Sequence, residues 1–228
     1  MTSVLLLLSG FAALVYQVLW MRDLAILFGN SAHAAAVDLA VFFGGIAAGA
    51  ALFARAAPRV ANPLRAYGLL ELGIAASALL FFALPEVYGW VYAPLYQRLA
   101  GVPAALVLAK GALAAGVLAV PTLLMGATLP AMVQHAPGRP AWLYGMNTLG
   151  GTLGAFAAGF FLPPTLGFRG SYLLAVGVNV IVGLAALGLS RRNGVRAPIP
   201  APPPAPAMLA EPQVGRAPPP RGGGAPAA

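Results

Sequence analysis

The chain has 228 residues, of which 60% are hydrophobic and 8% charged, with a mean hydropathy of +0.85, a formal net charge of +8 and no cysteine. A soluble domain carries roughly 25% charged residues, so the composition excludes an ordinary water-soluble enzyme, and the lack of cysteine excludes disulfides and thiolate metal sites. The basic side chains lie between apolar stretches rather than on one soluble face, so the charge indicates membrane topology and not nucleic-acid binding.

Six apolar stretches are long enough to cross the roughly 30 Å hydrocarbon layer, which takes about 20 helical residues. We expect helices over residues 4–28, 31–54, 63–84, 103–125, 141–162 and 171–189. Gly29-Asn30 should break the first, Pro121 should bend the end of the fourth, and Pro163-Pro164 should end the fifth. The first stretch has no basic residue before it and is longer than the apolar part of a signal peptide, so we expect it to be retained. The predicted fold class is an all-α membrane bundle of six helices in a 3+3 arrangement.

Aromatic residues are concentrated between the third and fourth stretches. Residues 86–98 hold three tyrosines and one tryptophan. Such rings favour the membrane–water interface, where an apolar body carries a wet polar tip. Stacking of these rings on a sugar or another ligand is the alternative.

The distribution of arginine predicts the orientation of the chain. Segments on the side of the N-terminus hold Arg55, Arg59, Arg65, Arg139, Arg191, Arg192, Arg196, Arg216 and Arg221, and segments on the other side hold Arg22, Arg98 and Arg169. Positive residues stay in the cytoplasm. We therefore expect a multi-pass membrane protein with both termini cytoplasmic.

The composition changes after the last apolar stretch. Half of the 22 prolines fall between Pro198 and Pro226, among alanine and glycine and without apolar periodicity. Such a segment buries too little apolar surface to offset its ordering entropy. The domain organisation is therefore a transmembrane domain over 1–190 and a disordered cytoplasmic tail over 191–228.

Small residues form two repeated patterns, Gly45-xxx-Gly49 and Gly150-xxx-Gly154. In lipid these patterns let helix backbones approach closely, so we expect them to pack helices, either within one chain or across a homodimer. No strand precedes the second pattern, which argues against a dinucleotide-binding loop. The glycine pairs at 44–45 and 150–151 each lie in the second helix of a three-helix half, as in transporters built from repeats.

Ionisable residues inside apolar spans are costly and mark functional sites by default. Helical rise of about 1.5 Å per residue places several of them at one depth. An outer polar layer is predicted from Gln17, Arg22, Asp23, Asp38 and Lys110, and an inner one from Glu71 and Asn147. The outer layer is either a structural ion-pair network or a path for a substrate or proton.

Other polar residues predict less. His33 and His135 have no acidic or histidine partner at helical spacing, so no metal site and no cofactor are expected. Asn147 and Asn179 favour hydrogen bonds between helices. A nucleophile elbow, a phosphate-binding loop and a catalytic pair of carboxylates are all missing from the sequence.

Five stretches together resemble a known family. They are Ser9-Gly-Phe-Ala-Ala-Leu-Val-Tyr-Gln-Val-Leu-Trp-Met-Arg22, Leu27-Phe-Gly-Asn-Ser31, Leu123-Leu-Met-Gly-Ala-Thr-Leu-Pro130, Leu143-Tyr-Gly-Met-Asn-Thr-Leu-Gly-Gly-Thr-Leu-Gly154 and Phe161-Leu-Pro-Pro-Thr-Leu-Gly-Phe-Arg-Gly170. In this order they are similar to the membrane portion of bacterial proteins that fuse a major-facilitator-like helical domain to a spermidine-synthase-like domain. The family-like positions are Tyr16, Gln17, Trp20, Arg22 and Asn147.

The resemblance implies a protein of the bacterial inner membrane related to polyamine chemistry. The synthase activity does not carry over, because no residue here matches the catalytic motif of the synthase domain, so we expect the chain not to be an enzyme. The leading hypothesis is a transporter-like or channelling unit for a polyamine or related cation, which as half of a standard bundle would form a homodimer. The alternatives are a non-catalytic anchor or scaffold for a separately encoded spermidine-synthase-like enzyme, and a truncated relic.

Overall fold

The computed structural model describes residues 1–28, 32–83, 86, 88–99 and 101–192. Every regular element in this part is helical, which confirms the all-α class for the described residues. The elements are α1 (Thr2–Phe28), α2 (Ala32–Ala56), η1 (Ala57–Arg59), α3 (Pro63–Ala78), η2 (Leu79–Ala83), η3 (Tyr88–Tyr92), α5 (Ala93–Leu99), α6 (Pro103–His135), α7 (Pro140–Phe160) and α8 (Leu162–Arg192). The expected break at Gly29-Asn30 and the tail after Arg192 lie outside the described residues.

Five helical stretches are long and apolar enough to cross a membrane, as a multi-pass membrane protein requires: Thr2–Ile26, Ala35–Arg59, Pro63–Ala83, Ala104–His135 and Leu162–Arg192. The sixth predicted span, 141–162, forms the helix α7 but is not one of these five. Its glycines and the polar side chains of Asn147, Thr148 and Thr152 lower its hydropathy. The apolar architecture is therefore confirmed, while the count of six spans is not.

Two helices extend beyond their predicted bounds, and one segment between helices is helical. α6 continues past Met125 to His135 and contains Pro121 and Pro130 in its interior; prolines are tolerated inside apolar helices when neighbouring groups satisfy the freed carbonyls. α8 begins at Leu162, so Pro163-Pro164 stand in its first turn, a position that suits proline. It is kinked at Gly167, where φ is +69°. The aromatic segment 86–98 is largely helical, as the π-helical turn η3 and the short helix α5.

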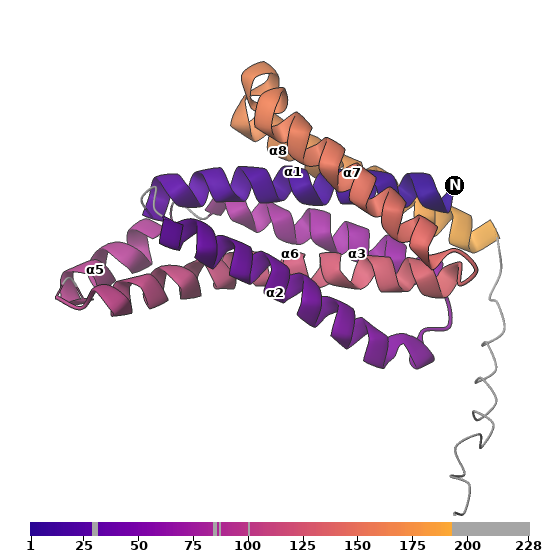
Figure 1. Cartoon of the computed structure of the whole chain (residues 1–228), viewed down its shortest axis with the longest axis horizontal. Helices are drawn as coiled ribbons and strands as arrows, with labels where there is room; N and C mark the ends of the chain where they lie inside the picture. The colour runs from indigo at the N-terminus through magenta and orange to yellow at the C-terminus, as the bar shows by residue number, and fades with distance from the viewer. Residues whose placement is uncertain (29–31, 84–85, 87, 100, 193–228) are drawn as a thin grey trace, which may run out of the picture. The chain divides into compact units, whose positions relative to one another are not determined.

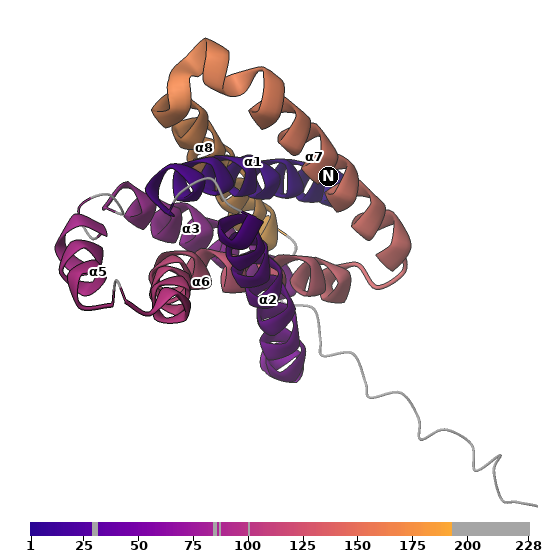
Figure 2. The same ribbon diagram turned by 60° about the vertical axis from the view of Figure 1, so that its left-hand side comes forward.

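The long helices pack in pairs: α1 lies along α7, α2 along α6, and α3 along α8 (Figures 1 and 2). Glycine makes the first two pairs close. A Cβ at Gly150 would collide with the backbone carbonyl of Leu7, and one at Gly49 with the carbonyl of Leu123. These glycine faces are therefore covered by helices of the same chain and are not available as the homodimer interface that we expected there.

The contacts repeat between the two halves of the chain, residues 2–83 and 103–192. Between α2 and α6, Gly49 meets the carbonyl of Leu123 and Gly126 meets that of Ile46. Between α7 and α1, Gly150 meets the carbonyl of Leu7 and Gly10 meets that of Asn147. The same three-residue spacings recur in both sets, so α2 corresponds to α7 and α6 to α1.

In the third pair the two helices are equivalent to each other: α3 of the first half corresponds to α8 of the second. A Cβ at Gly68 would lie 3.0 Å from Cγ of Leu187, and one at Gly183 would lie 2.8 Å from Cγ of Leu72. The two segments also share a sequence pattern, Gly68-Leu-Leu-Glu-Leu-Gly73 and Gly183-Leu-Ala-Ala-Leu-Gly188. The described part of the chain is therefore an internal repeat of two three-helix halves.

Candidate functional site: a polar layer at mid-depth of the bundle

The apolar core is divided into two clusters along the helix axes. The basal cluster, at the end where α1 begins, includes Leu5, Leu6, Leu64, Tyr67, Val182 and Ala186. The aromatic cluster, further along α1, includes Tyr16, Trp20, Phe42, Ile74, Phe81, Tyr172 and Ala175. On four of the six long helices a polar side chain stands between the two sets. These side chains form the polar layer, which consists of Ser9 on α1, Glu71 on α3, Asn147 on α7 and Asn179 on α8.

A carboxyl–amide pair forms the centre of the polar layer. Glu71 is 0% exposed and Asn179 is 1% exposed. Nδ2 of Asn179 donates a hydrogen bond of 2.5 Å to Oε2 of Glu71. The hydroxyls of Ser9 and Tyr67 also lie beside this carboxyl group, and Tyr67 itself donates to the carbonyl oxygen of Leu5 at 3.1 Å. Burying a carboxylate is costly unless it is paired. The hydrogen bond from Asn179 offsets part of this cost, and a carboxyl group at such a position suggests a functional role.

A cavity of about 380 Å³ opens at the same level. Each of the six long helices contributes to its wall, and the polar groups of the wall are Ser9, Thr128, Tyr144, Asn147 and Asn179. The remaining wall is apolar, with Phe42, Ile46, Ile74 and Met125 among its residues. A volume in this range with a few convergent polar groups is typical of a site for a small molecule.

A second carboxyl–amide pair lies further along α1. Nε2 of Gln17 donates a hydrogen bond of 2.7 Å to Oδ2 of Asp38 on α2. Asp38 is 1% exposed and Gln17 is 4% exposed. Lys110 on α6 is half-buried. It lies at the level of Asp38, because a Cβ at its neighbour Gly111 would lie 3.4 Å from Val37, the residue before Asp38. Two members of the predicted outer layer, Gln17 and Asp38, are therefore in direct contact. The helix of a third member, Lys110 on α6, packs against α2.

The other two predicted members lie elsewhere. Arg22 is exposed and Asp23 half-buried. Both line a separate cavity of about 320 Å³ together with Ile26, Pro163, Pro164 and Phe168, between α1 and the start of α8. The outer layer therefore splits into an enclosed part on α1 and α2 and an open part facing α8.

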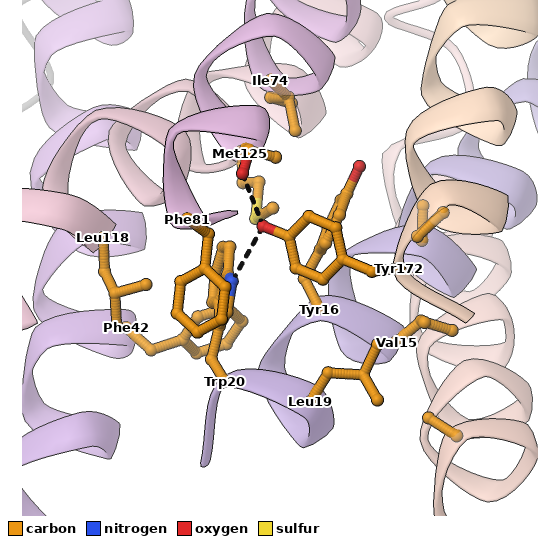
Figure 3. Packing of buried hydrophobic residues seen from close by; sticks show 14 of the residues in the cluster. Val15, Tyr16, Leu19, Trp20, Phe42, Ile74, Phe81, Leu118, Met125 and Tyr172 are labelled. Atoms are coloured by element: carbon orange, nitrogen blue, oxygen red, sulfur yellow. Dashed lines mark hydrogen bonds between the residues drawn. The ribbon is translucent and has the colours of Figure 1, made fainter. Parts of the chain in front are cut away.

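The aromatic cluster fixes α1 against α3 and α8. Nε1 of Trp20 donates to Oη of Tyr172 at 3.0 Å, and Oη of Tyr172 donates to the carbonyl oxygen of Ala78 at 2.7 Å (Figure 3). Tyr16 stacks on Trp20 with ring centroids 5.4 Å apart and meets the ring of Tyr172 edge-on at 5.1 Å. Two of the family-like positions, Tyr16 and Trp20, are therefore packing residues that hold Gln17, between them on α1, in register.

Sequence reasoning missed two of these participants and the partner of a third. Tyr172 begins an apolar stretch, and nothing in its surroundings marks it as the acceptor for Trp20. Ser9 stands in an apolar run as a small residue. Asn179 was expected to hydrogen-bond between helices, and it does so from α8 to α3, but its partner Glu71 could not be inferred from spacing. Depth along each helix was the available signal, because Glu71 and Asn179 both lie near the middle of their spans.

Compared with known proteins, the chain matches no family model, no curated protein and no solved structure. The candidate site therefore rests on its own geometry. Within the described ranges, no group of three or more histidine, aspartate or glutamate side chains gathers as a metal-binding cluster.

Proposed function

We propose that the chain is a transporter-like protein that carries a small organic cation, a polyamine or a related amine, across a bacterial cytoplasmic membrane. The observation that carries this proposal is the polar layer at mid-depth, where a buried carboxyl group stands beside a cavity walled by all six long helices. Transporters place their substrate sites near the membrane midplane between structural repeats. The likeness of the helices to the membrane portion of spermidine-synthase-fused proteins supports the choice of an amine.

The proposal includes α7 as a sixth membrane-crossing helix. α7 lies along α1, which is one of the five apolar spans. Its side chains at positions i, i+4, i+7 and i+11 are exposed and apolar, namely Leu149, Leu153, Phe156 and Phe160. A continuous apolar stripe of this kind suits contact with lipid. With six crossings, the two halves of the repeat have opposite orientations in the membrane.

The proposed orientation has the N-terminus in the cytoplasm. Six exposed arginines belong to the end of the bundle where α1 begins: Arg55, Arg59, Arg65, Arg139, Arg191 and Arg192. Contacts tie this end together, since Nε1 of Trp142 donates to Oγ of Ser3 at 3.0 Å and Nε2 of Gln134 donates to the carbonyl of Ala57 at 2.8 Å. The opposite end holds the exposed arginines Arg22, Arg98 and Arg169. An arginine-rich end is retained in the cytoplasm.

Uptake by reconstituted vesicles tests the function. We expect saturable uptake of a radiolabelled polyamine, reduced at least tenfold by Glu71→Gln and by Asp38→Asn, because each change removes a buried negative charge. Glu86→Gln is the matched control, since it makes the same chemical change at an exposed position. Absence of saturable uptake, or uptake unchanged in both buried variants, would overturn transport and favour the anchor hypothesis.

Labelling of single cysteines tests the topology, and the chain suits it because it has no native cysteine. Gly138→Cys, just before α7, and Leu166→Cys, in the first turns of α8 before the kink at Gly167, introduce exposed thiols on either side of α7 in the chain. A membrane-impermeant maleimide added to intact cells should label position 166 and not position 138. Equal labelling of both positions would contradict a membrane-crossing α7.

A further inference from the structure

The two carboxyl–amide pairs leave the same kind of atoms without partners. In each pair one amide N–H donates to one carboxylate oxygen. The four oxygens that remain are buried and accept no hydrogen bond from the described residues: Oε1 of Gln17, Oδ1 of Asp38, Oε1 of Glu71 and Oδ1 of Asn179. Each pair therefore presents two buried acceptor oxygens that receive no hydrogen bond.

Buried acceptors without donors are costly, and more so when they belong to charged groups. A ligand that suits them must bring donors and positive charge. An ammonium group carries three N–H donors and no acceptor, which matches two acceptor oxygens and a neighbouring hydroxyl such as that of Ser9. A bare Ca²⁺ or Mg²⁺ ion would require about six oxygen ligands, more than either pair supplies.

The two sites lie at a defined separation. Ser9, beside the Glu71 carboxyl group, and Gln17, on the Asp38 carboxyl group, are eight residues apart on α1, or roughly 12 Å at about 1.5 Å per residue. The cavity runs along α1 from the first site toward the second, lined there by Ser9, Gly10, Ala13 and Leu14, and its wall ends about one helical turn before the Asp38–Gln17 pair. Ala13 is one helical turn before Gln17, and the cavity residue Phe42 is one turn after Asp38.

We infer that the two carboxyl–amide pairs are the terminal subsites for one elongated organic dication, with one ammonium group at Glu71–Asn179 and the other at Asp38–Gln17. The apolar wall between them suits a methylene chain. An extended chain gains roughly 1.2 Å per bond, so the two nitrogens of the preferred ligand should be about eight to ten bonds apart. This inference refines the substrate class of the proposed transport function, yet it concerns binding and can be tested without transport.

The test is a binding series on the purified full chain in lipid nanodiscs, by calorimetry, with α,ω-diaminoalkanes of increasing length. Affinity should rise to a maximum when the nitrogens are about eight to ten bonds apart, and exceed that of the monoamine of equal length at least tenfold. The series needs no variant, so it is informative even where substitutions impair folding. Affinity that grows steadily with chain length, or equal affinity for the monoamine, would overturn the two-subsite assignment.

Variants then assign the two ends. Glu71→Gln and Asp38→Asn should each lower affinity for the best diamine at least tenfold, to the level of the monoamine, while Glu86→Gln leaves it unchanged. Lys110→Met tests whether the positive charge that pairs with Asp38 comes from Lys110 or from the ligand. If it comes from the ligand, the variant should bind the best diamine with unchanged or higher affinity. A tenfold fall in Lys110→Met would overturn the assignment of the Asp38 end.

Two controls separate the inference from its alternatives. Titration with NaCl and KCl tests an inorganic cation: saturable binding of either ion, with no binding of amines, would overturn the inference. Uptake in vesicles of the same protein separates it from the proposed function. Length-selective diamine binding without uptake would leave the two subsites standing and overturn transport, whereas uptake without length selectivity would do the reverse.

Discussion

The two three-helix halves use the same backbone contacts and different polar side chains. Gly49 and Gly150 hold equivalent positions, each against the backbone of the neighbouring helix. In contrast, both fully buried carboxyl groups, Asp38 and Glu71, lie in the first half. The position equivalent to Asn179 in the first half is Leu64, which is also buried. The repeat thus supplies a scaffold of close helix pairs, and the candidate site consists of the places where the halves differ.

The largest expected loss of stability comes from substitutions at the equivalent glycines of the two close helix pairs. Gly49→Leu and Gly150→Leu each place a side chain against the carbonyl backbone of a partner helix, where nothing flexible can move away. We expect each to cost more than about 5 kcal/mol, in the range seen only for severe core damage, and to prevent recovery of folded monomer after detergent extraction. Size-exclusion chromatography with thermal unfolding in detergent is the measurement.

Each glycine has a control on its own helix. A Cβ at Gly44 on α2, or at Gly159 on α7, would meet no atom within 4 Å. Gly44→Leu and Gly159→Leu should fold and show a melting temperature at or above that of the natural chain, because leucine has the higher helix propensity. If only one of the two packed glycines proved sensitive, the equivalence of the halves would be refuted.

The polar difference between the halves gives the next effect. Asn179→Leu copies Leu64 into the second half and removes the hydrogen-bond donor of Glu71. Breaking one member of a buried pair costs about 3–5 kcal/mol, so the free energy of unfolding in detergent should fall by that amount.

The double variant Glu71→Leu/Asn179→Leu sharpens this prediction. Replacing both members of a buried polar pair by apolar residues is often neutral or stabilising, so stability should recover most of the loss while amine binding disappears. A double variant as unstable as the sum of its single variants would show that the pair is structural and would remove it as a binding site.

Sequence reasoning predicted the scaffold better than the site. Apolar length predicted the helices, and in the structure Gly49 and Gly150 of the two small-residue patterns lie against the backbone of a neighbouring helix. The sixth span formed a helix but is not confirmed as a membrane span, because the glycines that let α7 approach α1 also lower its hydropathy. α6 was predicted too short, because the helix was expected to end near Met125, whereas it continues to His135 with Pro121 and Pro130 inside it.

The side-chain partners could not be predicted, because they depend on how helices rotate about their axes. Depth alone put Gln17, Asp38, Arg22 and Asp23 in one layer. The structure turns Gln17 inward to Asp38, whereas Arg22 and Asp23 face the start of α8. Residues five positions apart on a helix differ by about 140° in direction, so equal depth does not imply contact.

The smallest effect concerns two tyrosines of the aromatic cluster. Oη of Tyr172 accepts from Trp20 and donates to the carbonyl of Ala78, whereas Oη of Tyr16 is buried with no hydrogen-bond partner among the described residues. Tyr172→Phe leaves the indole N–H and the carbonyl oxygen unsatisfied and should cost about 1–3 kcal/mol. Tyr16→Phe removes a hydroxyl that gains nothing from its surroundings, so its unfolding free energy should be unchanged or higher.

The same chemical change at two rings in contact makes this pair of variants a sensitive comparison. Both variants keep the ring and its stacking, so a difference in thermal unfolding in detergent reports the hydroxyl groups alone. Because Tyr16 belongs to α1 in the first half and Tyr172 to α8 in the second, the result also shows which of the two hydroxyl groups contributes more to the stability of the aromatic cluster. Equal destabilisation by the two variants would mean that Tyr16 has a polar partner, and the Gln17–Asp38 pair one residue along α1 would be the first place to seek it.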